Sequence, residues 1–152
     1  MEKVRIYSVG VAVSCTEIGT EIYRKKPLSG SNLLASVQSI TNALSNWLQQ
    51  APTQLRMNFS NLNAHLSREC VSISLHFYSC VNMTARPLVF YVIQRRLEAG
   101  IPGSEIDDWK EGLSQNTVAV IDSCITAARA TTLIMDAAAK QNLLGTLRPF
   151  RW

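Results

Sequence analysis

Apolar side chains recur at helical spacing between residues 62 and 80. Their successive steps of four, four, three, four and three residues follow one face of an α-helix. A second apolar stripe at Val71, Leu75 and Tyr78 leaves little of the helix circumference polar. A helix that is apolar around most of its circumference is expected inside a bundle, so this segment predicts a central helix. The first stripe consists of Leu62, Leu66, Cys70, Ile73, Phe77 and Cys80.

The preceding segment predicts a second helix with the same spacing. Ser31 or Asn32 could cap its first turn, because their side-chain oxygens accept hydrogen bonds from free backbone amides. Pro52 is expected to end it, since proline has no amide hydrogen and disfavours helical geometry in the residue before it. The loop over residues 52–61 would then join two antiparallel neighbours. The apolar positions of this helix are Leu33, Val37, Ile40, Leu44 and Trp47.

The first 24 residues fit two patterns. The spacing of Val4, Tyr7 and Val11 is helical, whereas Val9, Val11 and Val13 alternate as in a strand. A lone strand would need a partner strand, and no other segment offers one, so a helix is favoured. Pro27 and Gly30 would follow its end.

The second half predicts further helices separated by strong breaks. Pro87 is expected to kink or restart the chain, with a short helix over residues 88–97 and a break at Gly-Ile-Pro-Gly, residues 100–103. Ser104 with Asp107 resembles a capping box, and a long helix follows from about Asn116 to the region of Gly145 and Pro149. The predicted fold class is all-α: an irregular bundle of five to six helices, forming one helical region over residues 1–152 and an incomplete domain.

Composition limits the class of protein. With 47% hydrophobic and 17% charged residues among 152, the chain is expected to fold around one core and not to be a disordered tail. The net charge of +4 comes from scattered Lys and Arg, so basicity alone does not indicate a nucleic-acid partner. No continuous run approaches the roughly 20 apolar residues that span a bilayer, so no membrane partner is expected.

The four cysteines are far apart in the sequence. Cys15, Cys70, Cys80 and Cys124 contain no C-x-x-C pair, so their spacing favours neither a zinc site nor a small disulfide framework. The expectation is four reduced and mostly buried thiols in a reducing aqueous compartment.

Residue types that carry chemistry are few. Two histidines, His65 and His76, would lie about 16 Å apart on one helix, which is too far to share a metal ion. Cys80 is one turn after His76, but no oxyanion donor or orienting carboxylate is apparent beside this pair. The acidic cluster of Glu105, Asp107 and Asp108 is explained by the dipole of a helix that begins there. We therefore predict no catalytic, cofactor-binding or metal-binding residue, and no enzyme.

Several local sequences in order resemble the regulatory middle homology region of fungal transcription factors with a binuclear zinc cluster. Residues 18–23, Ile-Gly-Thr-Glu-Ile-Tyr, are similar to the end of that family's first helix. Residues 44–55 resemble its Trp followed by a Leu-Pro-x-x-Leu turn, with Ala51 in place of the usual Leu. Residues 75–80 and 85–88 are similar to its helix with His and Tyr that leads to an Arg-Pro step. Residues 124–129 are similar to its helix that begins with Cys and contains Ala-Ala, and residues 145–147 and 150–152 to the aromatic segment that precedes the family's next helix.

The resemblance implies a nuclear, all-helical regulatory segment that controls transcription through packing with other parts of the same factor and with transcriptional regulators. Contact with nucleic acid would be indirect, and zinc would belong only to a separate DNA-binding domain, because the family uses six clustered cysteines for it. Self-association stays open, and the abrupt stop at Trp152 fits an internal fragment. The alternative is a self-sufficient helical module that binds an apolar small molecule between its helices.

Overall fold

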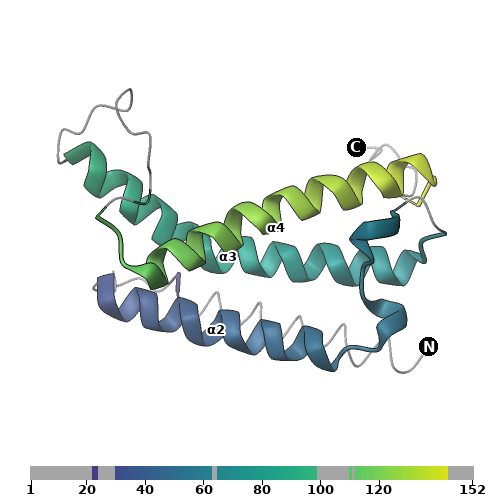
Figure 1. Cartoon of the computed structure of the whole chain (residues 1–152), viewed down its shortest axis with the longest axis horizontal. Coiled ribbons are helices and arrows are strands. Elements are labelled where there is room, and N and C mark those ends of the chain that lie inside the picture. The colour runs from purple at the N-terminus through teal and green to yellow at the C-terminus, as the bar shows by residue number, and fades with distance from the viewer. Residues whose placement is uncertain (1–21, 24–29, 63–64, 99–109, 111, 144–152) are drawn as a thin grey trace, which may run out of the picture.

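The computed structural model describes residues 22–23, 30–62, 65–98, 110 and 112–143. These ranges contain three α-helices, α2 (Gly30–Gln50), α3 (Arg68–Glu98) and α4 (Gln115–Lys140). Two short 3-10 helices, η1 (Thr53–Leu55) and η2 (Phe59–Asn61), connect α2 to α3 (Figure 1). No strand occurs in these ranges, so the all-α prediction is confirmed.

The middle helix of the bundle is α3. It packs against both α2 and α4, whereas α2 and α4 make little contact with each other. Successive helices run in opposite directions, so the arrangement is up-down-up (Figure 1). The prediction of a central helix in this part of the chain is therefore confirmed, and each outer helix covers one side of α3.

The helix α2 follows the predicted apolar stripe. Its positions Val37 and Leu44 are almost completely buried, with 0% and 1% of their surface exposed. The helix begins at Gly30, so Ser31 and Asn32 lie within its first turn and the prediction that they precede it as caps is wrong. It ends just before Pro52, as predicted.

The start of α3 differs from the prediction. The helix begins at Arg68 and not at residue 62, because Ser67 caps it: the Ser67 hydroxyl accepts a hydrogen bond from the Cys70 amide at 3.1 Å. Leu62 and Leu66 continue the apolar stripe outside the helix. His65 also precedes α3, so the two histidines do not share one helix.

The helix α3 continues through Pro87, so the prediction of a separate helix over residues 88–97 is wrong. Proline lacks the amide that would bond to the carbonyl four residues earlier, which belongs to Met83. The Tyr23 hydroxyl donates a hydrogen bond to this carbonyl at 2.9 Å. A side chain from the N-terminal part of the chain therefore replaces the missing backbone donor, and α3 extends for 31 residues.

The helix α4 has defined caps at both ends. The Ser114 hydroxyl accepts a hydrogen bond from the Thr117 amide at 3.2 Å. At the other end Asn142 has a φ of 54°, and the amides of Asn142 and Leu143 bond to the carbonyls of Ala139 and Ala138, which is a Schellman motif. This motif ends the helix before Gly145, where the sequence pattern placed the end.

Two groups of buried side chains form the core. The larger core cluster joins α2, α3 and the first half of α4. The smaller core cluster joins the start of α3 to the second half of α4. The larger one contains Ile22, Leu33, Val37, Ile40, Leu44, Phe77, Cys80, Val81, Ala85, Leu88, Val120 and Ala127, and the smaller one contains Leu66, Val71, Ile134, Ala137 and Ala138.

Several predictions concern residues outside the described ranges. These are the helix before residue 22, the exit at Pro27, the break at residues 100–103, the cap at Ser104 and the features at Gly145 and Pro149.

Candidate functional site

A groove of about 300 Å³ lies where the three helices meet. It reaches the lower limit of the roughly 300–1,000 Å³ that small-molecule sites occupy. Its floor is apolar and comes from α3 and α4, and its rim is polar and comes from α2 and α4. The lining residues are Thr41, Ser45, Phe77, Tyr78, Val81, Asp122, Ser123, Thr126 and Ala127.

Two aromatic rings of α3 belong to the floor of the groove and are held by rings of α2 and η2. Phe77 and Tyr78 meet edge to face with ring centroids 5.1 Å apart, and Trp47 of α2 stacks on Phe77 at 6.1 Å. Phe59 of η2 adds an edge contact to Tyr78 at 6.0 Å. Such ring pairs contribute stabilisation beyond the burial of their area, so the rings of Phe77 and Tyr78 are held in place before any ligand enters.

The hydroxyl groups at the rim mostly bond to their own helices. Thr41 donates to the Val37 carbonyl at 2.8 Å, and Ser123 donates to the Ala119 carbonyl at 2.9 Å. Their oxygens keep lone pairs that can accept a hydrogen bond from a ligand. The groove therefore offers acceptors above an apolar floor.

Asp122 brings a negative charge to the groove. Its carboxylate lies 3.2 Å from the ammonium group of Lys110, and the side chains of Lys110 and Asp122 are about half exposed, at 46% and 49%. An exposed ion pair of this kind contributes little to stability. It can reorganise when a cationic or hydrogen-bond-donating ligand approaches.

Burial raises the pKa of the Tyr78 hydroxyl above its ordinary value, because the apolar surroundings disfavour the phenolate. Tyr78 is therefore a neutral donor at physiological pH. A neutral phenol, hydroxyls and a paired carboxylate can bind and orient a ligand.

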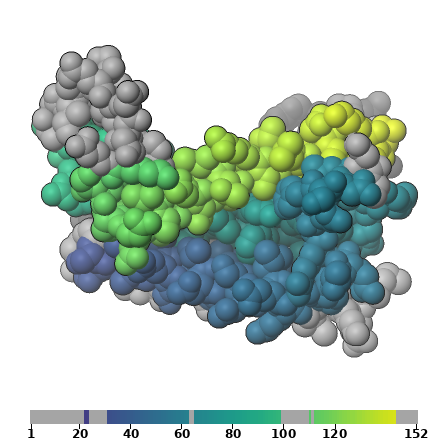
Figure 2. Space-filling view, viewed as in Figure 1, coloured from purple at the N-terminus to yellow at the C-terminus, as the bar shows by residue number. Residues whose placement is uncertain are grey.

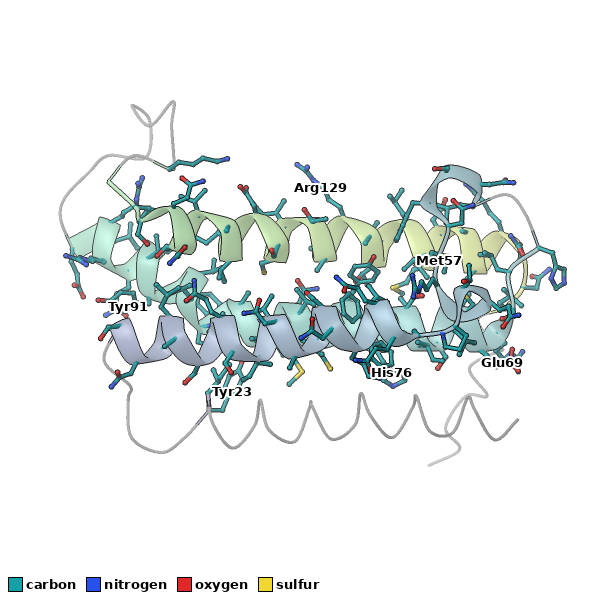
Figure 3. The ribbon with its side chains drawn as sticks, turned by 60° about the horizontal axis from the view of Figure 1, so that its bottom comes forward. Tyr23, Met57, Glu69, His76, Tyr91 and Arg129 are labelled. Carbon is teal, nitrogen blue, oxygen red and sulfur yellow. The ribbon has the colours of Figure 1, made fainter. Side chains whose placement is uncertain are left out.

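The two histidines are exposed and separate from the groove. His76 lies on α3, and its Nδ1 donates a hydrogen bond to the Ser72 carbonyl at 2.8 Å, one turn earlier in the same helix (Figure 3). Among the described residues, no group of three or more His, Cys, Asp and Glu side chains could hold a metal ion.

The cysteines do not all match the prediction of reduced thiols. Cys70 and Cys124 are free, but Cys80 is disulfide-bonded, so that prediction is wrong for Cys80. Cys80 is completely buried and cannot act as a nucleophile beside His76 while it is in a disulfide. Burial raises the pKa of both free thiols, against smaller opposing effects of a hydrogen bond from Ser74 on Cys70 and of the Arg86 charge on Cys124.

A second feature is an exposed apolar stripe near the end of α3, which we call the α3 stripe. It consists of Phe90, Ile93 and Leu97, at helical steps of three and four, with exposed fractions of 61%, 48% and 73%. Arg86 lies on the same face one turn before Phe90. The last turns of α3 extend beyond the first turns of α2 and α4 in both ribbon views (Figures 1 and 3), so they lie outside the bundle.

Sequence reasoning missed both features. The residues of the groove come from three segments that no sequence spacing links, so only the packing brings Thr41 and Asp122 together. The α3 stripe could have been found, since Arg86, Phe90, Ile93 and Leu97 follow helical steps once the helix is continued through Pro87. The acidic cluster of residues 105–108 lies outside the described residues.

Comparisons with known proteins add no relative. No protein-family model matches the chain, and neither a curated protein nor a solved structure is significantly similar to it.

Proposed function

We propose that the chain is a regulatory segment of a transcription factor of the fungal zinc-cluster class, which controls transcription by binding other protein segments and makes no DNA contact of its own. The observation that carries this proposal is the α3 stripe. Three large apolar side chains on one exposed helix face are typical of a protein-binding surface. The proposed full domain is a bundle of five to six helices that acts in the nucleus, and the three described α-helices would be part of it.

Charge next to the stripe favours an acidic partner. Arg86 shares its face and Arg95 lies on the same helix, both exposed, while Gln94 engages the carboxylate of Glu98 in the last turn at 2.9 Å. An acidic amphipathic segment would place its apolar side chains on the stripe and its carboxylates near these guanidinium groups. Activation segments of transcription factors have this alternation of acidic and hydrophobic residues. The chain would restrain transcription by covering such a segment.

The direct test is binding of a labelled synthetic peptide in which Asp and Glu alternate with Leu and Phe, followed by fluorescence anisotropy. We expect binding that weakens with added salt and falls more than about tenfold in the double variant Phe90→Ser, Leu97→Ser. The matched control is Tyr91→Ser, which removes a similarly exposed aromatic residue from another face of the same helix. Equal loss of binding in the control variant would contradict the proposal. So would binding, with the same affinity, of a peptide in which Lys and Arg replace the Asp and Glu residues.

The second part of the test concerns DNA. The chain alone is expected to produce no sequence-specific, salt-resistant shift of duplex DNA, because its proposed contact with nucleic acid runs through a separate domain. Fused between a heterologous DNA-binding domain and an acidic activation segment, it should lower reporter transcription, and Phe90→Ser with Leu97→Ser should restore it.

The groove favours a second candidate function, a helical module that binds an apolar small molecule. The apolar floor of Phe77, Val81 and Ala127 and the acceptors on the rim suit a compact apolar ligand with a donor group. A thermal-shift screen of such metabolites should find one that raises the melting temperature, and Ala127→Phe should abolish that shift by filling the floor. A screen without any stabilising compound would remove this candidate.

A further inference from the structure

The outer face of α4 has the composition of a helix interface. Its exposed side chains point away from α3, and Figure 2 shows α4 lying across the surface of the molecule. By length and composition alone, α4 is long and apolar enough to cross a membrane. Only 33% of its most apolar 18-residue stretch is buried inside the structure. We define the α4 outer face as one stripe of the exposed α4 residues, namely Ile125, Ala128, Arg129, Thr132, Met135, Asp136 and Ala139; the exposed Leu133 lies beside this stripe.

These positions are symmetric about Thr132. Ile125 and Ala139 lie seven residues before and after it, Ala128 and Asp136 four, and Arg129 and Met135 three. Steps of three, four and seven keep residues on one face of a helix. If a second copy packs antiparallel with its two-fold axis at Thr132, every residue of the face meets another residue of the same face. A two-fold interface requires this self-complementarity.

The charges on the face are complementary in the same arrangement. Arg129 projects from α4 away from the bundle (Figure 3) and makes no ion pair with a described residue, while Asp136 pairs with Lys140 of its own helix at 2.7 Å. Antiparallel pairing about Thr132 places Arg129 of one copy within one residue step, about 1.5 Å along the axis, of Asp136 of the other. Two ion pairs related by the axis would form at once.

We propose that a second copy of this chain binds the α4 outer face, with the two α4 helices antiparallel and Thr132 at the two-fold axis. Ala128 and Ala139 allow the backbones to approach, while Ile125 and Met135 lose their exposed surface. This dimer does not depend on the proposed regulatory function, because it uses α4 and leaves the α3 stripe free for another partner.

The size of the contact sets the expected affinity. The stripe from residue 125 to 139 is about 21 Å long and about 10 Å wide, so each copy contributes on the order of 200–400 Å². Stable complexes bury about 800 Å² per partner, so the dimer is weak and depends on concentration. Sedimentation equilibrium from about 10 µM to 1 mM covers the relevant range of dissociation constants.

Charge exchange is the decisive experiment. Arg129→Asp alone and Asp136→Arg alone each place like charges together at both pairs, and each should weaken the dimer about tenfold. An equimolar mixture of the two variants restores opposite charges at both pairs, so a mixed dimer should form with the wild-type affinity or better. The chain that carries both substitutions should also dimerise like the wild type.

Control variants separate this dimer from non-specific association. Arg95→Asp makes the same charge change on α3 and should leave the dimer unchanged, and circular dichroism should show intact helix content in every variant. Wild-type chain that stays monomeric at about 1 mM would overturn the proposal, as would failure of the mixture to recover. The proposal would also be overturned, in favour of a lipid surface, by two results together. These are flotation of the wild-type chain with vesicles of phosphatidylcholine and phosphatidylserine, and self-association that Arg129→Asp leaves unaffected.

Discussion

The two core clusters hold the ends of the bundle together by different means. The larger one is built from branched aliphatic side chains of α2 against α3, with Leu44 and Val37 fully enclosed. Among the residues that the structure describes, the smaller one contains five buried side chains, and those of Ala137 and Ala138 are single methyl groups. Apolar burial therefore stabilises the two ends unequally.

Hydrogen bonds compensate at the smaller cluster. The Gln141 side chain accepts from the Leu66 amide at 2.9 Å and donates to the Leu62 carbonyl at 3.2 Å. One residue after the end of α4 thus holds the segment that leads into α3. Enclosed apolar volume therefore determines stability at one end of the bundle, and hydrogen bonding of buried polar groups determines it at the other.

The largest effect is expected from Leu44→Ala in the larger cluster. Removal of a fully buried leucine leaves a cavity, so the free energy of unfolding should fall by about 2–5 kcal/mol. Urea unfolding followed by circular dichroism measures this change. Leu48→Ala, one turn later and only partly buried, is the matched control and should lose less than half as much. Equal losses would show that this end does not depend on enclosed volume.

Gln141→Leu should be the most damaging polar change at the smaller cluster. It keeps the size of the side chain but leaves the Leu66 amide and the Leu62 carbonyl without this partner, which should reduce stability by about 1–3 kcal/mol. Gln141→Glu keeps the acceptor for the amide and loses the donor, so its loss should be intermediate. A stable Gln141→Leu variant would mean that apolar packing also dominates at this end.

Tyr23→Phe tests a hydrogen bond beside the larger cluster. Loss of the donor to the Met83 carbonyl should lower the free energy of unfolding by about 1 kcal/mol. In the background of Pro87→Ala, position 87 regains an amide that can bond to the same carbonyl, so Tyr23→Phe should then have almost no effect. Equal effects in both backgrounds of this double-mutant cycle would refute the role of Tyr23 as the replacement donor.

The sequence predicted the parts of the fold that depend on periodicity. The stripe of α2, the central position of α3 and the length of α4 follow from apolar spacing, because burial of one helix face is a local requirement. The ends of the helices did not follow from it. Ser67, Ser114 and Asn142 decide them, and each acts through single hydrogen bonds or one φ angle that periodicity does not register.

Tertiary partners account for the rest. The rule that proline interrupts a helix failed at Pro87 because Tyr23, 64 positions earlier in the sequence, satisfies the exposed carbonyl. The groove was invisible for the same reason, since Thr41, Tyr78 and Asp122 are brought together only by packing. The disulfide bond of Cys80 was missed for the same reason, because cysteine spacing in the sequence does not show which thiols meet in the fold.

The alkylation rates of the two free thiols allow the two ends of the bundle to be compared in the wild-type chain itself. Cys124 is half-buried and packs against the larger cluster, whereas Cys70 is buried near the start of α3 and directly precedes Val71 of the smaller cluster in the sequence. Burial raises the pKa of both thiols, so less thiolate is present at any given pH than for an exposed cysteine. The alkylation rate of both should therefore increase at a higher pH than that of an exposed cysteine. In the native wild type Cys124 should react faster than Cys70, because it is more exposed.

In the Leu44→Ala variant, the alkylation rates of Cys124 and Cys70 show whether the two ends of the bundle open separately. If the ends open independently, the cavity in the larger cluster should accelerate alkylation of Cys124 and leave that of Cys70 nearly unchanged, as peptide mass spectrometry after timed quenching would show. Leu48→Ala provides the control, with a smaller acceleration at Cys124. Equal acceleration of both thiols would mean that the bundle opens only as a whole, so that the chemically different ends form one cooperative unit.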